Sequence, residues 1–152
     1  MAQNIIVPVD FSNVTDSVLA MAKRMARTLG AKLWLIHVGS PMPDFVGFEV
    51  GPPSVRTDVA RELREEHRLL QERVEGLRKE GLEAEALLAT GLPADKIVQE
   101  AERLNVDMII LGSHGHGALY HLLAGSVCQG VLKRAPCPVV IVPARAAVPA
   151  EV

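Results

Sequence analysis

The chain has 152 residues, of which 49% are hydrophobic and 22% are charged, and its formal net charge is −2. This length is enough for one domain with a sizeable core, and the composition is that of a soluble globular protein. A slightly acidic chain with 3% aromatic residues gives no reason to expect a nucleic acid partner, because such proteins present basic patches and aromatic stacking surfaces. No window approaches the roughly 18 apolar residues that a membrane-spanning helix needs, so membrane insertion is not expected.

The N-terminal residues and the two cysteines indicate the cellular compartment of the protein. Met1–Asn4 carry no basic side chain and run directly into an apolar segment, so no signal peptide is predicted. Cys128 and Cys137 do not make a disulfide framework, and we interpret both as buried apolar side chains in a reducing compartment. We therefore expect a cytoplasmic protein that forms one domain over residues 1–152, with a frayed tail at 144–152.

In chain order, the pattern opens with a strand and a helix. The β-branched run 5–9 predicts the first strand, and the cap-forming residues 10–13 follow it. Apolar residues then recur at helical spacing, which predicts a helix that ends at Gly30 as its C-cap. Residues 32–38 predict a second strand. Residues 39–54 contain four prolines and three glycines and predict a loop long enough to act as a flap.

The second half continues the alternation. An apolar stripe from Val55 to near Gly81 predicts a long helix, whose many charges we interpret as a solvated and internally paired surface. The later elements are shorter, and they are a strand at 83–88, a helix at 93–104, a strand at 107–111, a helix at 126–134 and a strand at 139–142.

Five apolar strands separated by helices predict an α/β fold with a mostly parallel sheet covered on both faces. In open sheets of this kind, ligands bind beyond the carboxyl ends of the strands, where the strand order reverses. We expect the first and fourth strands to form the central pair. Their ends carry Val9-Asp10 and Gly112–Gly115, so the two most polar turns would lie side by side.

Two small clusters near the fourth strand indicate a phosphate site. Gly112–Gly115 directly follows an apolar run, and Gly125-Ser126 stands at the predicted start of a helix. Glycine lets a backbone approach a ligand without a Cβ atom in the way, and a helix N-terminus offers N–H groups and a favourable dipole to an anion. The alternative is tight-turn geometry with no ligand.

Five segments stand in an order and spacing that match a known family, over about residues 3 to 143. They are Val7–Ser12, Gly91–Pro93, Asp107–Gly115, Leu122–Val127 and Ala135–Val142. With these segments the chain resembles the universal stress protein family. The resemblance implies an open twisted five-stranded parallel sheet of order 3-2-1-4-5 with helices on both faces, similar to the adenine nucleotide alpha hydrolases.

The resemblance extends to the ATP-binding members of that family. Those members are marked by Gly, two residues, Gly, nine residues, Gly and then Ser or Thr, and Gly112, Gly115, Gly125 and Ser126 fit that spacing. The implied ligand is ATP or another adenine nucleotide, with Mg or Mn carried by its phosphates. The family also implies a homodimer in which the last strand, Val139–Val142, pairs across a two-fold axis.

The same resemblance assigns roles to individual residues. Asp10 would accept a hydrogen bond from a ribose hydroxyl, and the amides of Ser126 and Val127 would hold the outer phosphates. The remaining contacts are an adenine slot formed by Pro8, Val9 and the main chain of Val38, a sugar contact from Leu111, and a phosphate loop of Gly112, Ser113, His114 and Gly115. For Asp10 and Ser126, the alternative is a plain helix cap.

Metal binding by the protein and dedicated catalysis are not expected. His114, His116 and His121 lie close in sequence but have no carboxylate or cysteine beside them. A Walker motif is absent, and Lys133 and Arg134 are expected to point away from the site. The leading hypothesis is a nucleotide-responsive regulatory homodimer in the stress response. A slow ATPase or autophosphorylating protein and a nucleotide-free interaction module remain as alternatives, and the protein partner is unknown.

Overall fold

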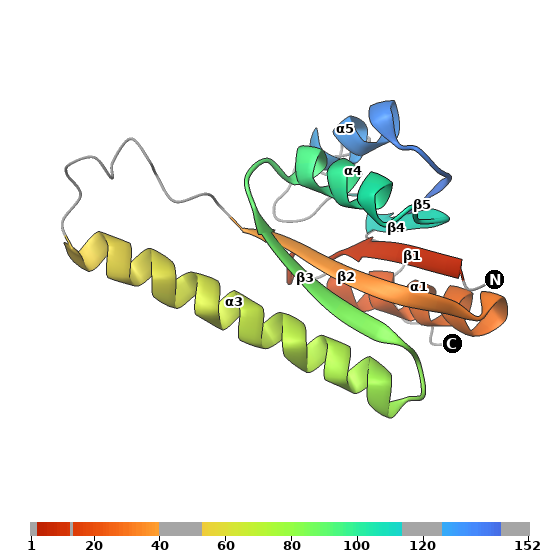
Figure 1. The fold of residues 1–152 in the computed structure, drawn as a ribbon, viewed down its shortest axis with the longest axis horizontal. Coiled ribbons are helices and arrows are strands. Elements are labelled where there is room, and N and C mark those ends of the chain that lie inside the picture. The colour runs from red at the N-terminus through yellow and green to blue at the C-terminus, as the bar shows by residue number, and fades with distance from the viewer. Residues whose placement is uncertain (1–2, 13, 40–52, 114–125, 144–152) are drawn as a thin grey trace.

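The computed structural model describes residues 3–12, 14–39, 53–113 and 126–143. Strands and helices alternate along these residues (Figure 1). In chain order they are β1 Gln3–Pro8, α1 Thr15–Leu29, β2 Ala31–Gly39, α3 Pro53–Lys79, β3 Ala84–Thr90, α4 Pro93–Arg103, β4 Met108–Gly112, α5 Ser126–Arg134 and β5 Val139–Val142.

The strands form one parallel sheet of order β3-β2-β1-β4-β5, which confirms the predicted topology. β1 lies at the centre, where Val7 pairs with Leu35 of β2 and Ile6 pairs with Ile109 of β4. Ile5, Ile6 and Val7 are 0% exposed, because a central parallel strand is covered on both faces. The strand order therefore reverses at β1.

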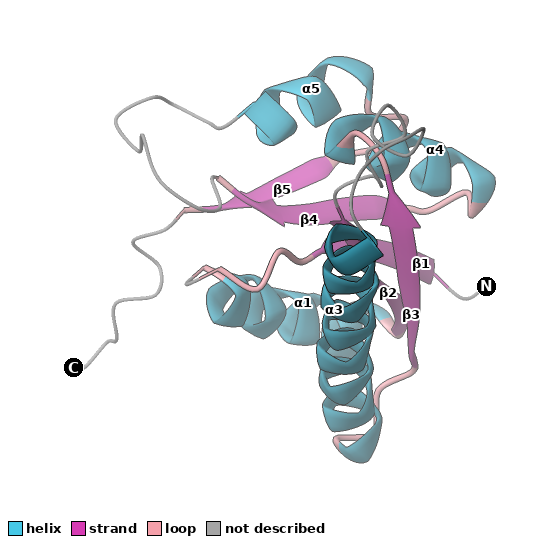
Figure 2. Cartoon of the chain, turned by 90° about the vertical axis from the view of Figure 1, so that its left-hand side faces the viewer, coloured by secondary structure: helices cyan, strands magenta, loops and turns pink. Residues whose placement is uncertain are grey.

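Two layers of helices cover the sheet (Figure 2). α1 and α3 lie on one face, where alternate residues such as Val7 and Leu35 join their apolar side chains in one core cluster. α4 and α5 lie on the other face, over a second cluster that contains Ile36 and Ile109. The separation follows from the period of two in a strand, which sends successive side chains to opposite faces.

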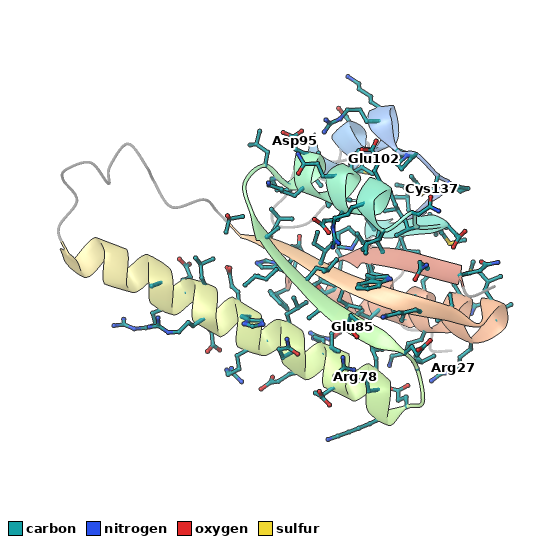
Figure 3. All side chains as sticks on the ribbon, in the orientation of Figure 1. Arg27, Arg78, Glu85, Asp95, Glu102 and Cys137 are labelled. Atoms are coloured by element: carbon teal, nitrogen blue, oxygen red, sulfur yellow. The ribbon has the colours of Figure 1, made fainter. Side chains whose placement is uncertain are left out.

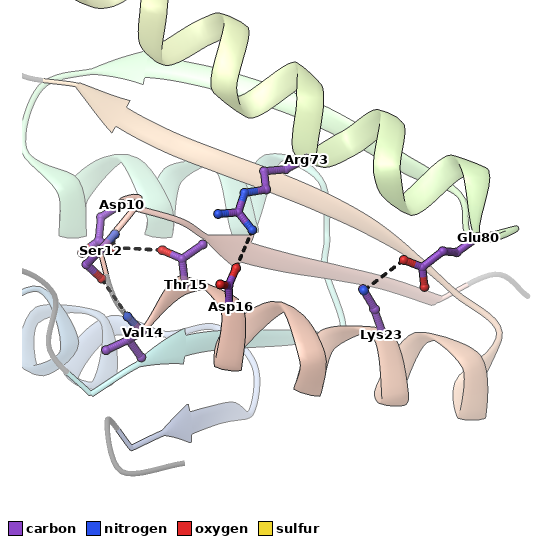
Figure 4. Close-up of polar contacts among 8 residues, drawn as sticks. All are labelled: Asp10, Ser12, Val14, Thr15, Asp16, Lys23, Arg73 and Glu80. Carbon is purple, nitrogen blue, oxygen red and sulfur yellow. Dashed lines mark hydrogen bonds and ion pairs between the residues drawn. The ribbon is translucent and has the colours of Figure 1, made fainter. Parts of the chain in front are cut away.

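The long helix α3 packs through its second half. Leu70, Val74 and Leu77 are at most 2% exposed against the sheet. Its charges pair as predicted, since Arg68 bonds both Glu65 and Glu72. Two contacts from this segment to α1 are drawn in Figure 4. Arg73 of α3 bonds to Asp16 at 2.6 Å, and Glu80, which directly follows α3, bonds to Lys23 at 3.0 Å.

The C-terminal end of α3 is attached to the edge strand β3 through the side chain of Arg78. Arg78 Nε donates to the Ala84 carbonyl at 2.9 Å, and Arg78 Nη2 lies 3.6 Å from Glu85 Oε1. Figure 3 shows Arg78 and Glu85 side by side. Gly81, in the turn between α3 and β3, has a φ of +89°, a conformation that glycine adopts at little cost.

Several element ends differ from the prediction. β2 runs to Gly39 and β3 to Thr90, because the Gly91 N–H donates to the Gly39 carbonyl at 3.2 Å and extends their pairing. α3 begins at Pro53. The remainder of the predicted flap, 40–52, and the tail 144–152 lie outside the described residues.

The two cysteines have different surroundings. Cys128 is 2% exposed, as predicted, whereas Cys137 is only partly buried. Burial raises the pKa of both thiols, and Asp107 adds to the effect at Cys137. Neither residue is in a disulfide.

No helix in the described part of the chain is both long enough and apolar enough to cross a membrane.

Candidate functional site

The carboxyl ends of β1 and β4 lie next to each other at one edge of the sheet. β1 ends at Pro8, and Val9 and Asp10 follow it, while β4 ends at Gly112 and leads into Ser113. The Ser113 N–H donates to the Val142 carbonyl at 2.9 Å, so the chain stays aligned with β5 at this point. The predicted juxtaposition is present as far as Ser113, the last described residue after β4. It coincides with the point of reversed strand order, where open α/β sheets bind ligands.

Asp10 organises the turn that leads from β1 into α1 (Figure 4). Its Oδ1 accepts hydrogen bonds from the Ser12 N–H at 3.0 Å and from Thr15 Oγ1 at 3.4 Å, and Ser12 Oγ accepts from the Val14 N–H. Among the described residues, both bonds to Asp10 reach Oδ1, which leaves Oδ2 of this exposed side chain open to a ligand.

The alternative role of Asp10 as an N-cap is wrong. The N-cap residue of α1 is Val14, and it makes no side-chain cap hydrogen bond. Asp10 instead holds a turn in which Phe11 has a φ of +59°, an uncommon conformation for a residue with a side chain. The turn therefore carries local strain that its hydrogen bonds offset.

Val9 is fully engaged with the protein. Its N–H donates to the Ile36 carbonyl at 2.9 Å, its carbonyl oxygen lies 2.8 Å from His37 Nδ1, and the residue is 5% exposed. Pro8, the last residue of β1, is partly buried. Both main-chain groups of Val9 therefore already have partners within the protein, so at the predicted adenine slot Val9 can contribute only packing contacts.

The main chain of Val38 differs from that of Val9. Alternate residues of a strand hydrogen-bond to opposite neighbours. The Ile36 carbonyl accepts from Val9 on the β1 side, and the Gly39 carbonyl accepts from Gly91 on the β3 side. Val38 therefore faces the β1 side, yet the register of β1 with β2 ends at Pro8 and Ile36. Within the described residues, no backbone hydrogen bond joins Val38 to Val9.

Gly112 has a packing reason to be glycine. A Cβ atom added there would lie 3.1 Å from Cγ1 of Val14 and 3.4 Å from Cγ2 of Val18, both on the α1 side. The neighbouring Leu111 is 3% exposed and belongs to the core cluster under α4 and α5. The end of β4 therefore packs against α1 on one face and against the second core cluster on the other, and Gly112 and Ser113 are both partly exposed.

α5 begins at Ser126, as predicted, and Val127 is partly buried in its first turn. The helix is fixed to α4 by close packing, since a Cβ atom on Gly130 would lie 2.7 Å from Cβ of Ala94. Arg134 Nη2 also donates to Asp95 Oδ1 at 2.6 Å, so Arg134 engages α4. His114, Gly115 and Gly125 lie outside the described residues.

No group of three potential metal ligands occurs among the residues that the structure describes. The histidines at 114, 116 and 121 are not among them.

Sequence reasoning missed the role of His37, a residue at the end of the predicted second strand. The residue is 7% exposed. Its ring contacts the Val9 carbonyl, the ring of Phe11 at 4.8 Å between centroids, and Glu66 of α3. The available signal was a titratable residue that follows Leu33 and Leu35 at intervals of two, so that it shares their buried face.

The chain is similar to known proteins over most of its length. The sequence model of the universal stress protein family matches residues 1–143. A universal stress protein from Thermus aquaticus is 34% identical over 143 residues, covering 93% of this chain and 99% of the relative.

Two solved structures share the fold. The universal stress protein UspA from Lactobacillus plantarum has a TM-score of 0.76 at 21% identity, covering 92% of this chain and 97% of that one. A universal stress protein from Archaeoglobus fulgidus, solved in complex with dAMP, has a TM-score of 0.65 at 26% identity, covering 91% and 96%.

Proposed function

The chain belongs to the universal stress protein family, and on that premise we propose that it binds an adenine nucleotide beyond the carboxyl ends of β1 and β4. The observation that carries the proposal is the convergence of Asp10, Val38 and Ser113 at the point of reversed strand order. The dAMP complex of the Archaeoglobus fulgidus relative supports it.

Each part of the nucleotide has a matching group at this edge. The main chain of Val38 reads the base, while Pro8 and Val9 shape the slot. Asp10 accepts a hydrogen bond from the ribose through Oδ2, which its own turn leaves open. The phosphates extend along the segment after β4 towards the N–H groups at the start of α5, Ser126 and Val127.

The preferred nucleotide is ATP. This finer proposal rests on the sequence spacing of Gly112, Gly115, Gly125 and Ser126, which is the spacing that marks the ATP-binding members of the family. Mg or Mn is carried by the phosphates.

The biological role that we propose is regulatory. The protein acts in the cytoplasm as a homodimer whose surface responds to nucleotide occupancy, without dedicated catalysis. The dimer forms through β5, an edge strand of four aliphatic residues that pairs with β4 on one side only.

A thermal shift experiment tests nucleotide binding. A ligand at 100 times its dissociation constant stabilises the folded state by about 2.7 kcal/mol, which raises Tm by roughly 5–10 °C for a chain of this size. We expect that shift with ATP, and a smaller one with sodium tripolyphosphate, which lacks the base and the ribose. The variant carrying Gly115→Val and Gly125→Val is expected to lose the shift with ATP. An unchanged Tm of the wild-type protein in millimolar ATP would refute the proposed function.

A further inference from the structure

His37 is a buried histidine at the carboxyl end of β2. Its side chain is on the same face of the sheet as Leu33 and Leu35, beneath α1 and α3. Only 9% of the side chain is exposed. A polar ring in such surroundings needs hydrogen-bond partners, because an unpaired buried group costs stability.

One ring nitrogen has a well-placed partner. His37 Nδ1 lies 2.8 Å from the carbonyl oxygen of Val9. A carbonyl oxygen can only accept, so Nδ1 carries a proton and donates it. Nε2 lies 3.2 Å from Oε1 of Glu66, within ion-pair distance but without hydrogen-bond alignment. The bond to Val9 is therefore the directed contact of the ring, and Phe11 packs against it.

This bond changes the end of the strand ladder between β1 and β2. The Val9 N–H continues the ladder beyond β1 by donating to the Ile36 carbonyl. In a parallel ladder the next bond runs from the Val38 N–H to the Val9 carbonyl. The His37 ring donates to that carbonyl, and among the described residues the Val38 N–H has no partner in the β1 turn.

We propose that His37 is a positioning residue for base recognition, because its hold on the Val9 carbonyl keeps the Val38 N–H available to a ligand. The inference rests on the proposed function. An N–H donor beside the carbonyl acceptor of the same residue matches adenine, whose N1 accepts and whose 6-amino group donates. Guanine presents the opposite pair, a donor at N1 and an acceptor at O6, so the same edge disfavours it.

Two substitutions separate this role from simple packing. His37→Leu keeps an apolar side chain of similar size and removes the donor. His37→Asn places an amide N–H donor near the position of Nδ1. Since a net hydrogen bond is worth about 0.5–1.5 kcal/mol, we expect His37→Leu to weaken ATP binding by roughly 5–10-fold, and His37→Asn to bind ATP within about 2-fold of the wild-type protein.

Calorimetric titration with ATP, GTP and sodium tripolyphosphate provides the measurement. His37→Leu should lower the preference for ATP over GTP and leave tripolyphosphate affinity unchanged, because only base recognition is affected. The matched control is His67→Leu, a change at an exposed histidine on α3 whose partner is Gln71, and it should alter none of these values. Equal losses for ATP and tripolyphosphate in His37→Leu, or no loss for ATP, would overturn the positioning role.

Amide hydrogen exchange at Val38 tests the same idea without a nucleotide. The Val38 N–H should exchange rapidly in the wild-type protein and in His37→Asn, and more slowly in His37→Leu, where the released Val9 carbonyl can accept it. A protected Val38 amide in the wild-type protein would contradict the inference. If the wild-type protein binds no adenine nucleotide, the proposed function and base recognition are both wrong. The exchange rate of the Val38 amide then still shows whether the His37 ring keeps the Val9 carbonyl from bonding to Val38.

Discussion

Asp10 is held in place by its own turn before any ligand arrives. The Ser12 N–H and Thr15 Oγ1 both bond to Oδ1, so the orientation of the carboxylate is fixed by groups within five residues of it. A side chain that is already ordered loses little conformational entropy on binding. At the residue scale, the proposed site is therefore pre-organised on the β1 side.

The substitution Asp10→Asn tests this arrangement. The amide oxygen can keep the bonds to Ser12 and Thr15, whereas the charged acceptor at Oδ2 becomes a neutral donor. A hydrogen bond to a charged group is worth about 1.5–3 kcal/mol, so we expect nucleotide affinity to fall by at least about 10-fold with little change in unfolding free energy. Calorimetric titration gives the affinity, and urea denaturation followed by the fluorescence of Trp34, the single tryptophan, gives the stability.

Asp16→Asn is the matched control for that experiment. Asp16 is also an aspartate near the start of α1, but it pairs with Arg73 on the side facing α3. Its replacement should leave nucleotide affinity unchanged. If Asp10→Asn binds the nucleotide with the same affinity as the wild-type protein, Asp10 does not contact the ribose.

At the scale of elements, the position of α5 depends on how closely it packs against α4. The approach is possible because residue 130 has no side chain, since a Cβ atom there would lie 2.7 Å from Cβ of Ala94. Real Cβ atoms do not come this near, and neither methyl group can rotate away. The first turn of α5, proposed to hold phosphates, is therefore placed by a contact one turn further along the helix.

Gly130→Ala tests that contact. In an open helix the change would stabilise the protein by about 0.5–1 kcal/mol, but here the helices must separate, and overpacking costs about 1–3 kcal/mol. We expect a net loss of unfolding free energy in urea denaturation. Gly76→Ala in α3 is the control, because nothing lies within 4 Å of an added Cβ there, and it should stabilise. Equal gains in both variants would show that α4 and α5 are not in tight contact.

The elements themselves were largely predictable from sequence, because their signals are local. The apolar run at Ile5–Val7 is buried on both faces, and Gly30 ends α1 with a φ of +67°, as a C-cap glycine does. Strand ends were less predictable, because the length of β3 depends on its partner, with Gly91 bonding to Gly39 across the sheet.

The details of the candidate site were less accessible. Sequence placed Asp10 at the site but gave its plain alternative as a helix cap, whereas the side chain forms a turn around Phe11 at positive φ. The bond from His37 to Val9 spans 28 positions in the chain, and no local pattern encodes it. Such contacts depend on the assembled sheet, so only the structure revealed them.

At the scale of the whole molecule, the two edges of the sheet differ in a way that matters for assembly. β3 carries Glu85, whose carboxylate has Arg78 and Lys32 within 3.6 Å, and charges on an edge discourage pairing with another chain. β5 consists only of valine and isoleucine. The contrast makes β5 the edge suited to a second copy of the chain.

The hydrogen-bond pattern shows how to test that edge without disturbing the sheet. The Ile109 N–H bonds to the Pro138 carbonyl and the Ser113 N–H to the Val142 carbonyl, so even-numbered residues of β5 face β4 and the N–H of Ile141 faces outward. Ile141→Pro therefore removes an outward donor and leaves the ladder with β4 intact. In sedimentation velocity at micromolar concentration, we expect the wild-type protein at twice the mass of one chain and Ile141→Pro at the mass of one.

The corresponding change on the other edge is the control. The Leu33 N–H bonds to the Glu83 carbonyl, so odd-numbered residues of β3 face β2 and the N–H of Ala86 faces outward. Ala86→Pro should remain dimeric, because its edge is not the proposed interface. If Ala86→Pro dissociates while Ile141→Pro does not, the interface lies at β3. If the wild-type protein itself sediments at the mass of one chain, the proposed homodimer is wrong.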